Sequence, residues 1–224
     1  MTWRRHGQLI DVPDAGGFRG DGLPAWMKPL LDVIPSMTTD QVTRFAPVDG
    51  RGRHAAVLIL FSGDRDIVLI ERAHGDAVHS GQPAFPGGAV ETFDSDVQAA
   101  ALREANEEIG IAPADVRILG LLPDLWVPVS DFVVSPVLAF SDAQVPIGVQ
   151  DSAEVRRVER VPVDSLVDPE NRFTVVHPSG YRGPGFDVQQ MLVWGFTAGV
   201  IDALLDKSGW STPWDRSREV RIER

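Results

Sequence analysis

The segment ALREANEEIG (residues 101–110) places three glutamates within five residues, and their spacing is that of a helix rather than a strand. At about 100° per residue, Glu107 lies roughly 60° to one side of Glu104 and Glu108 roughly 40° to the other, so all three carboxylates point the same way. Like charges at this spacing repel by ~0.2 to 0.5 kcal/mol per pair in an isolated helix. The segment therefore predicts either a solvated acidic face or a face that binds something cationic.

The flanking residues predict that this helix covers about residues 95–109 and is amphipathic. Apolar residues recur at spacings of three and four beside the glutamates: Val97, Ala100, Ala101, Ala105 and Ile109. Asp94 or Ser95 is expected to cap the first amides, and Gly110 to take the left-handed position after the last turn. Function is therefore expected on the polar side of the helix.

Outside this helix the pattern is that of an α/β protein. Two apolar, β-branched runs at residues 55–61 and 66–72 predict a hairpin across the intervening Ser62–Arg65 turn. Further strands are expected at residues 116–122, 132–140 and 155–163, and a long helix at residues 190–209.

The ends of the chain differ from its centre. Residues 1–50 are rich in Gly, Pro and Asp and read as an irregular leader that packs on the domain, with one helix at about residues 24–33. Residues 210–224 are expected to form a surface tail, which leaves residues 51–209 as one domain because no long Gly-rich or Ser-rich linker divides them. Two smaller domains remain an alternative.

The composition is that of an ordinary soluble globular protein, with 224 residues, 43% of them hydrophobic and 24% charged. No apolar run reaches the ~18 to 20 residues that span a bilayer, and the first residues lack a secretory signal, so we expect no membrane association and a cytoplasmic location. The formal charge of −11 argues against nucleic-acid binding, because phosphate backbones require Lys and Arg. With no Cys, a metal site must use oxygen or imidazole ligands.

A glycine-rich stretch directly before the helix completes a longer pattern. GGAVETFDSDVQAAALREANEEIGI (residues 87–111) resembles the signature of Nudix hydrolases: G, five residues, E, seven residues, then R-E-U-x-E-E-x-G-U, where U is apolar. Counted from Gly88, Asp94 stands at the first Glu position, eight residues separate it from Arg103, and Ala105 fills the first U position. The resemblance implies a Nudix fold, an α/β/α sandwich with a mixed β-sheet, and pyrophosphate hydrolysis with Mg²⁺ or Mn²⁺.

The longer spacing and the preceding FPGG resemble the coenzyme A pyrophosphatase branch of that family. VLIERAHGDAVHSGQPAFPGG (residues 68–88) matches the motif of that branch at Arg72, Ala73, Gly81 and residues 85–88. Where the branch has a second Arg, this chain has Ala77, preceded by Asp76.

This departure leaves two interpretations. Either the enzyme discriminates weakly between coenzyme A and dephospho-coenzyme A, or another cation, such as Arg72, Arg182 or a leader residue, supplies the charge.

The resemblance also implies roles for individual residues. Metal ligands would be Glu104, Glu107, Glu108 and the carbonyl of Gly88, and the residues assigned to catalysis are Glu107, Glu108, Glu154 and Arg103. Arg103 lies about 100° around the helix from Glu104, so it is expected to point away from the metals and to support the site by tethering Asp94 or orienting a glutamate. Glu154 is either a water-activating base or a solvated charge. Substrate contacts are assigned to Arg72, His79, Gly81, Phe85 and Arg182; loop packing for His79 and a plain surface loop for Arg182 stay open.

The implied substrate is a small nucleotide pyrophosphate, first of all coenzyme A or an acyl-CoA, with 3',5'-ADP and a 4'-phosphopantetheine species as products. The alternatives are ADP-ribose or a dinucleotide, or a non-catalytic Nudix-fold module that binds a ligand. A binder has no need for a whole set of metal ligands, so the intact REANEEIG favours an enzyme. The oligomeric state is open, and a homodimer is among the options.

Overall fold

The computed structural model describes residues 22–43, 47, 52–73 and 81–222. Within these residues the larger of two sheets consists of β1 (Arg53–Ser62), β2 (Asp66–Arg72), β3 (Pro83–Ala84), β4 (Gly87–Ala89), β5 (Val116–Leu121), β6 (Leu125–Val127), β7 (Phe132–Ser141) and β8 (Val155–Pro162). The smaller sheet consists of β9 (Arg172–Val176), β10 (Arg182–Val188), β11 (Met191–Val193) and β12 (Glu219–Arg221). The helices are α1 (Lys28–Val33), α2 (Thr39–Val42), α3 (Val97–Ile109), α4 (Val163–Val167) and α5 (Gly195–Lys207), with short 3₁₀ turns at Ala25–Met27, Ile34–Ser36, Pro113–Asp115 and Pro169–Asn171.

The larger sheet is mixed. Its strands follow the order β3-β2-β1-β7-β5, with β4 beside β1, β6 beside β7 and β8 beside β2. β1 and β7 run parallel, and the other recorded pairs of this sheet are antiparallel. The hairpin expected over residues 55–72 is confirmed as β1 and β2. The strands expected after the helix are confirmed as β5, β7 and β8.

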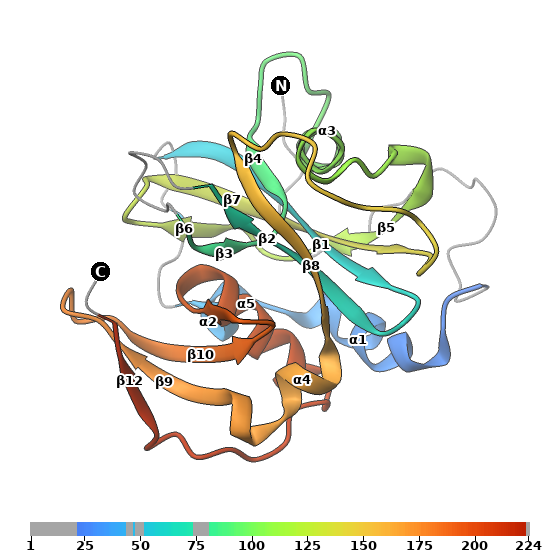
Figure 1. Cartoon of the computed structure of the whole chain (residues 1–224). Helices are drawn as coiled ribbons and strands as arrows, with labels where there is room; N and C mark the ends of the chain where they lie inside the picture. Colours follow the sequence, from blue (N-terminus) through green and yellow to red (C-terminus); the bar gives the residue numbers. More distant parts are fainter. Residues whose placement is uncertain (1–21, 44–46, 48–51, 74–80, 223–224) are drawn as a thin grey trace.

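The central strand β1 is buried on both faces, which fixes the layers of the molecule. Leu58 and Leu60 belong to the core cluster under α3, whereas Ile59 and Phe61 belong to the cluster that includes α1 and α5. Alternate residues of a strand point to opposite faces, so a continuous apolar run is what a strand between two helical layers requires. Figure 1 shows α3 on one side of the sheet and α5 with α1 and α2 on the other. The expected α/β/α sandwich is therefore confirmed.

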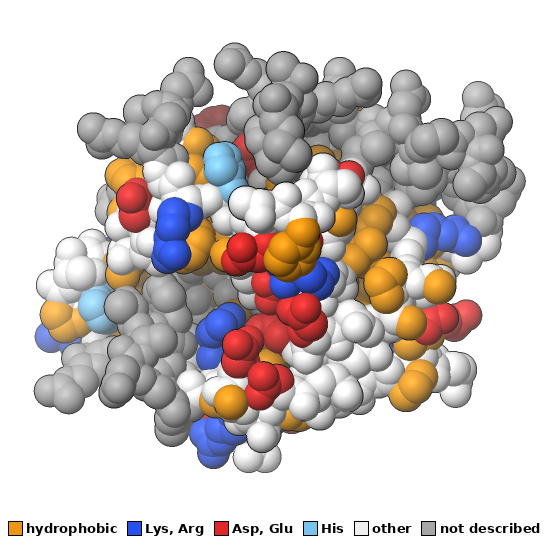
Figure 2. Space-filling model, turned by 90° about the horizontal axis from the view of Figure 1, so that it is seen from above, with side chains coloured by type: hydrophobic (Ala, Val, Ile, Leu, Met, Phe, Trp, Pro, Cys, Tyr) orange, Lys and Arg blue, Asp and Glu red, His pale blue; other side chains and the backbone are white. Residues whose placement is uncertain are grey.

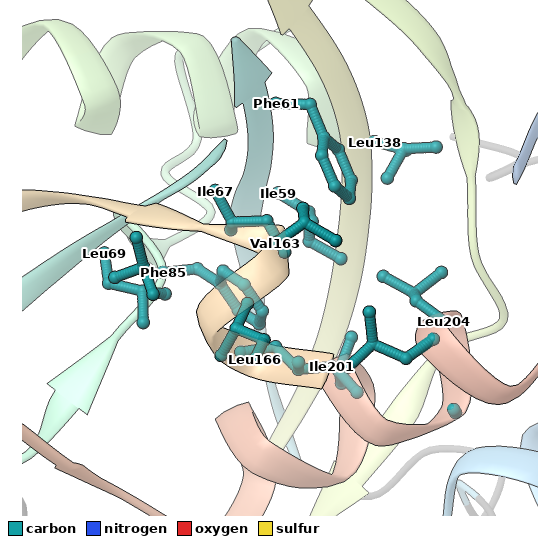
Figure 3. Close-up of a cluster of buried hydrophobic side chains, with 14 of the residues drawn as sticks. Ile59, Phe61, Ile67, Leu69, Phe85, Leu138, Val163, Leu166, Ile201 and Leu204 are labelled. Carbon is teal, nitrogen blue, oxygen red and sulfur yellow. The ribbon is translucent and has the colours of Figure 1, made fainter. Parts of the chain in front are cut away.

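The α5 side holds the larger cluster. Figure 3 shows side chains from the sheet meeting Ile201 and Leu204 of α5 and Val163 and Leu166 of α4. Apolar residues of β10 and β11 complete this cluster, and the smaller sheet thereby packs against α5.

The start of α3 corrects one prediction. The cap is Asp96, whose side chain accepts hydrogen bonds from the amides of Gln98 at 2.9 Å and Ala99 at 2.8 Å. Neither Asp94 nor Ser95 caps the helix, because the side chain of Asp94 binds Arg103 instead. The end of α3 is as predicted: Gly110 has φ +76° and closes the last turn.

The structure of the C-terminal region corrects two further predictions. The single helix expected over residues 190–209 is wrong at its start, because β11 precedes α5. Gln189 and Gln190 both have positive φ and form the β10–β11 turn, a conformation for which Gln–Gln gives no sequence signal. The surface tail is also wrong in part: Trp210 packs against Phe61, and β12 pairs in parallel with β9.

The leader contains the expected helical segment, as a 3₁₀ turn followed by α1. Met27, Leu30 and Ile34 are at most 1% exposed and lie in the main core cluster. Among the described residues, no helix is both long enough and apolar enough to cross a bilayer.

Candidate active site

The three glutamates of α3 differ in depth. Glu108 is 1% exposed, and the amide N–H of Gly87 donates to its Oε2 at 2.8 Å. The side chain of Glu104 is 14% exposed and that of Glu107 is 57% exposed. Figure 2, seen from above, shows a band of Asp and Glu side chains across this face with basic side chains beside it. The helix therefore presents a row of carboxylates that runs from the core to solvent.

Arg103 ties this row together. Its Nε and Nη2 donate to the two carboxylate oxygens of Asp94, each at 3.0 Å, and Nη2 also donates to the carbonyl of Ala89 at 3.1 Å. Nη1 donates to Glu104 at 2.8 Å and to Glu107 at 2.9 Å. The paired hydrogen bonds to Asp94 fix the plane of the guanidinium, and this holds the two glutamates on one side of the helix. The expected tether to Asp94 is present, but the expectation that Arg103 points away from the glutamates is wrong, because Nη1 reaches Glu104 and Glu107.

The two glycines before the helix allow the close approach of β4. A Cβ on Gly88 would lie 2.6 Å from the carboxylate of Glu104. A Cβ on Gly87, which has φ +152°, would lie 2.3 Å from the carbonyl oxygen of Ala56 on β1. Residues without a side chain are thus needed both to pair β4 with β1 and to leave room for a glutamate.

Burial and mutual repulsion disfavour the ionised forms of these carboxyls. Desolvation is the largest cause that raises the pKa of Glu108 to about 7; the Gly87 amide and Arg72 oppose it, and Glu104 and Glu154 add to it. Desolvation likewise raises the pKa of Glu104, against the hydrogen bond from Arg103. A positive charge placed among these carboxyls would favour their ionised forms, so the site suits a cation.

Arg72 and Glu154 bring charges of opposite sign to this region from the end of β2 and the turn before β8. Arg72, at the end of β2, places Nη1 3.7 Å from Oε1 of Glu108. Glu154 lies in the turn before β8, and its carbonyl accepts a hydrogen bond from the amide of Ala73 at 2.7 Å. The charge of Glu154 acts on Glu104 and Glu108, as its contribution to their raised pKa values shows.

The loop that carries Glu154 is fastened to the end of α3. The amides of Gly148 and Gln150 donate to the carbonyls of Ile109 at 3.0 Å and Glu108 at 3.1 Å. The side chain of Asp151 then accepts from the amide of Ala153 at 2.8 Å. This tether was not predicted from the sequence, although the Gly-x-Gln-Asp run in a loop is a turn signal that could have indicated it.

Three predicted substrate contacts have other surroundings. Phe85 is 2% exposed and packs in the main core, so the structure gives it a packing role instead of a substrate contact. Arg182 pairs at 2.6 Å with Glu219 in the smaller sheet, not with the glutamates of α3. Gly81, with φ +72°, donates its amide to the carbonyl of Arg72 and closes the connection between β2 and β3. His79 lies outside the described residues.

The candidate ligand atoms are of the chemical type that a hard divalent cation prefers. Oε1 of Glu108 is buried without a hydrogen-bond partner, and the other candidate ligands are carboxylate and carbonyl oxygens. Across residues 22–43, 47, 52–73 and 81–222, however, no three acidic or imidazole groups stand close enough to hold an ion. Nη1 of Arg103 holds one carboxylate oxygen of Glu104 and one of Glu107.

Comparison with known proteins identifies the family of the chain. Residues 50–181 match the NUDIX domain. The uncharacterized Nudix hydrolase NudL of Enterobacter sp. (strain 638) is 35% identical over 179 residues, which cover 76% of this chain and 86% of that protein. The NudL protein of Cronobacter sakazakii (strain ATCC BAA-894) is 37% identical over 161 residues, covering 68% and 81%. A NUDIX hydrolase structure from Nitrosomonas europaea aligns with a TM-score of 0.49 at 15% identity, over 78% of this chain and 82% of that one. By its matched domain and these relatives, the chain belongs to the Nudix hydrolase family.

Proposed function

We propose that this Nudix hydrolase cleaves the pyrophosphate of coenzyme A or an acyl-CoA, giving 3',5'-ADP and the matching 4'-phosphopantetheine. One observation carries the proposal. The stretch that resembles the coenzyme A branch begins at Arg72 and ends at Gly88, and near both ends it contacts Glu108, through the Arg72 guanidinium and the Gly87 amide. The branch motif therefore frames the most buried carboxylate of the site.

In this proposal Glu104, Glu107, Glu108 and the carbonyl of Gly88 hold Mg²⁺ or Mn²⁺. Nudix hydrolases generally use divalent metal ions. The chemistry that such a cation supplies when bound is neutralisation of the diphosphate and acidification of a water.

The remaining groups act on the substrate or on the ligands. Arg72 neutralises a phosphate oxygen beside Glu108, Glu154 accepts the proton of the attacking water, and Arg103 fixes the directions of Glu104 and Glu107. A cytoplasmic location, as expected from the sequence, suits a coenzyme A substrate.

Hydrolysis of a panel of pyrophosphates tests the substrate. Coenzyme A, acetyl-CoA, ADP-ribose and a dinucleotide are each incubated with protein and Mg²⁺ or Mn²⁺, and products are identified by mass spectrometry. We expect the highest kcat/KM for the coenzyme A compounds. Preferred cleavage of ADP-ribose or the dinucleotide would replace coenzyme A by the runner-up substrate, and binding without cleavage would indicate a ligand-binding module.

Glu154→Gln tests the assigned base. Loss of a general base lowers kcat by ~10² or more with little change in KM, because the substrate still binds. An unchanged kcat would return Glu154 to the status of a solvated charge.

A further inference from the structure

A buried carboxylate on β2, one residue before Arg72, is shared by two arginines. Glu71, on β2, is 8% exposed. Nη1 of Arg156 donates to its Oε1 at 2.7 Å, and Nε of Arg157 donates to its Oε2 at 2.6 Å. One carboxylate therefore faces two guanidinium groups, and Arg157 also lies 3.6 Å from Oε1 of Glu159, so that Arg157 is shared between two carboxylates.

The two arginines are used differently. Arg157 is 28% exposed, and it also donates to the carbonyls of Gln189 at 3.1 Å and Gln190 at 2.9 Å. Its guanidinium thus fastens the β10–β11 turn to β8. Arg156 is 60% exposed and, within the part of the chain that the structure describes, makes a single hydrogen bond, to Glu71. Most of its planar set of donors is therefore available to a ligand.

The position of Arg156 places this charge at the active-site end of the sheet. Val155, its neighbour in β8, is the register partner of Arg72, and Glu71 pairs with Arg157, so Arg156 is the extra residue of a bulge in β8. Arg72 in turn contacts Glu108, and Glu154 lies two residues before Arg156. A guanidinium that keeps most of its donors unused, two residues after Glu154, is suited to an anion that the carboxylates of the site would repel.

We infer that Arg156 binds a substrate phosphomonoester outside the pyrophosphate, such as the 3'-phosphate of coenzyme A. The inference rests on the proposed function to the extent that the substrate is a nucleotide pyrophosphate. Arg72, in contact with Glu108, serves the pyrophosphate, and Arg156 serves the additional phosphate. Arg156 is then the cation that stands in for the Arg absent from the branch motif at Ala77.

The test compares coenzyme A with dephospho-coenzyme A, which differ only in this phosphate. Both are assayed with the wild type, Arg156→Gln and the control Lys28→Gln, which removes one exposed positive charge in α1. We expect the wild type to prefer coenzyme A. In Arg156→Gln the ratio of the two kcat/KM values should fall by ~10-fold or more, mainly through KM for coenzyme A, whereas Lys28→Gln should keep the ratio.

Two results would overturn the inference: an unchanged ratio in Arg156→Gln, or an equal loss on both substrates, which would indicate a positioning role for this arginine. Thermal unfolding shows whether Arg156→Gln keeps the wild-type fold, as we expect because Arg157 still pairs with Glu71 in the variant. If the wild type cleaves ADP-ribose but neither coenzyme A compound, the proposed substrate is wrong. The role of Arg156 is then tested with ADP-ribose and ADP-ribose 2'-phosphate, by the ratio of their kcat/KM values in the wild type and in Arg156→Gln.

Discussion

Glu108 combines burial, repulsion and support from an amide in one side chain. It lies deepest of the three glutamates of α3, and its Oε2 is held by Gly87 while Oε1 has no hydrogen-bond partner. The spacing of REANEEIG predicted that the three carboxylates share a side, but it could not predict which of them is buried. Depth depends on how closely β4 approaches α3, a tertiary contact that helical periodicity does not encode.

Glu108→Gln should separate activity from stability. The substitution removes a carboxylate whose ionised form is poorly solvated, so we expect the free energy of unfolding to stay the same or to rise. Turnover should fall by ~10²-fold or more, because an assigned metal ligand is lost. Steady-state kinetics and thermal unfolding measure the two effects, with Glu170→Gln on the surface as control. Near-normal metal-dependent turnover would remove Glu108 from the metal site.

The ion pair of Asp94 with Arg103 stabilises the site in a pH-dependent way. Its hydrogen bonds with Arg103 are the largest cause that lowers its pKa below the usual value. A lowered folded-state pKa means that the contribution to stability is present above the unfolded pKa of about 3.9 and is lost as the pH falls through the folded value.

Asp94→Asn should therefore destabilise the protein by ~1 to 3 kcal/mol at pH 7, with a difference from the wild type that shrinks as the pH falls through the lowered folded-state pKa of Asp94. Chemical denaturation at several pH values measures it. A difference that persists undiminished in acid would show that packing, rather than charge, is what Asp94 contributes.

At the scale of elements, sequence patterns predicted the regular strands and α3 but not the exceptions. The apolar runs of β1, β2 and β7 are long enough to identify, whereas β3, β4 and β11 have two or three residues each and follow from pairing with neighbours. The same limit applies to caps. Asp94, Ser95 and Asp96 are all good capping residues. The hydrogen bond from Arg103 to Asp94 is a tertiary contact that excludes Asp94, and the cap is Asp96.

Asp96→Ala tests that cap. Removing the acceptor for the amides of Gln98 and Ala99 should lower the free energy of unfolding by ~0.5 to 2 kcal/mol. Ser95→Ala, one residue away, serves as the matched control and should have a smaller effect. Urea denaturation of both variants provides the comparison, and an equal loss in the two would contradict the assignment of Asp96.

At the scale of the whole molecule, the core extends beyond the segment that carries the chemistry. Composition and the resemblance predicted the α/β/α layers, but the smaller sheet and the packing of Trp210 could not be derived from local patterns. β12 pairs with β9 across more than 40 residues of sequence, and such a pairing is set by the tertiary fold alone. The leader likewise has no strong periodicity, although α1 completes the cluster on the α5 side.

Leu30→Ala decides how much the molecule depends on that leader. Leu30 is fully buried against the sheet cluster, so its truncation removes apolar contacts and leaves a cavity, at a cost of ~2 to 5 kcal/mol. Leu192→Ala deletes the same atoms from a side chain that is 37% exposed, and it should cost clearly less. Denaturation of both variants gives the difference. If the two losses were equal and small, α1 would be an attachment to the domain; a large loss confined to Leu30→Ala would make it part of the folding unit on which the geometry around Glu108 depends.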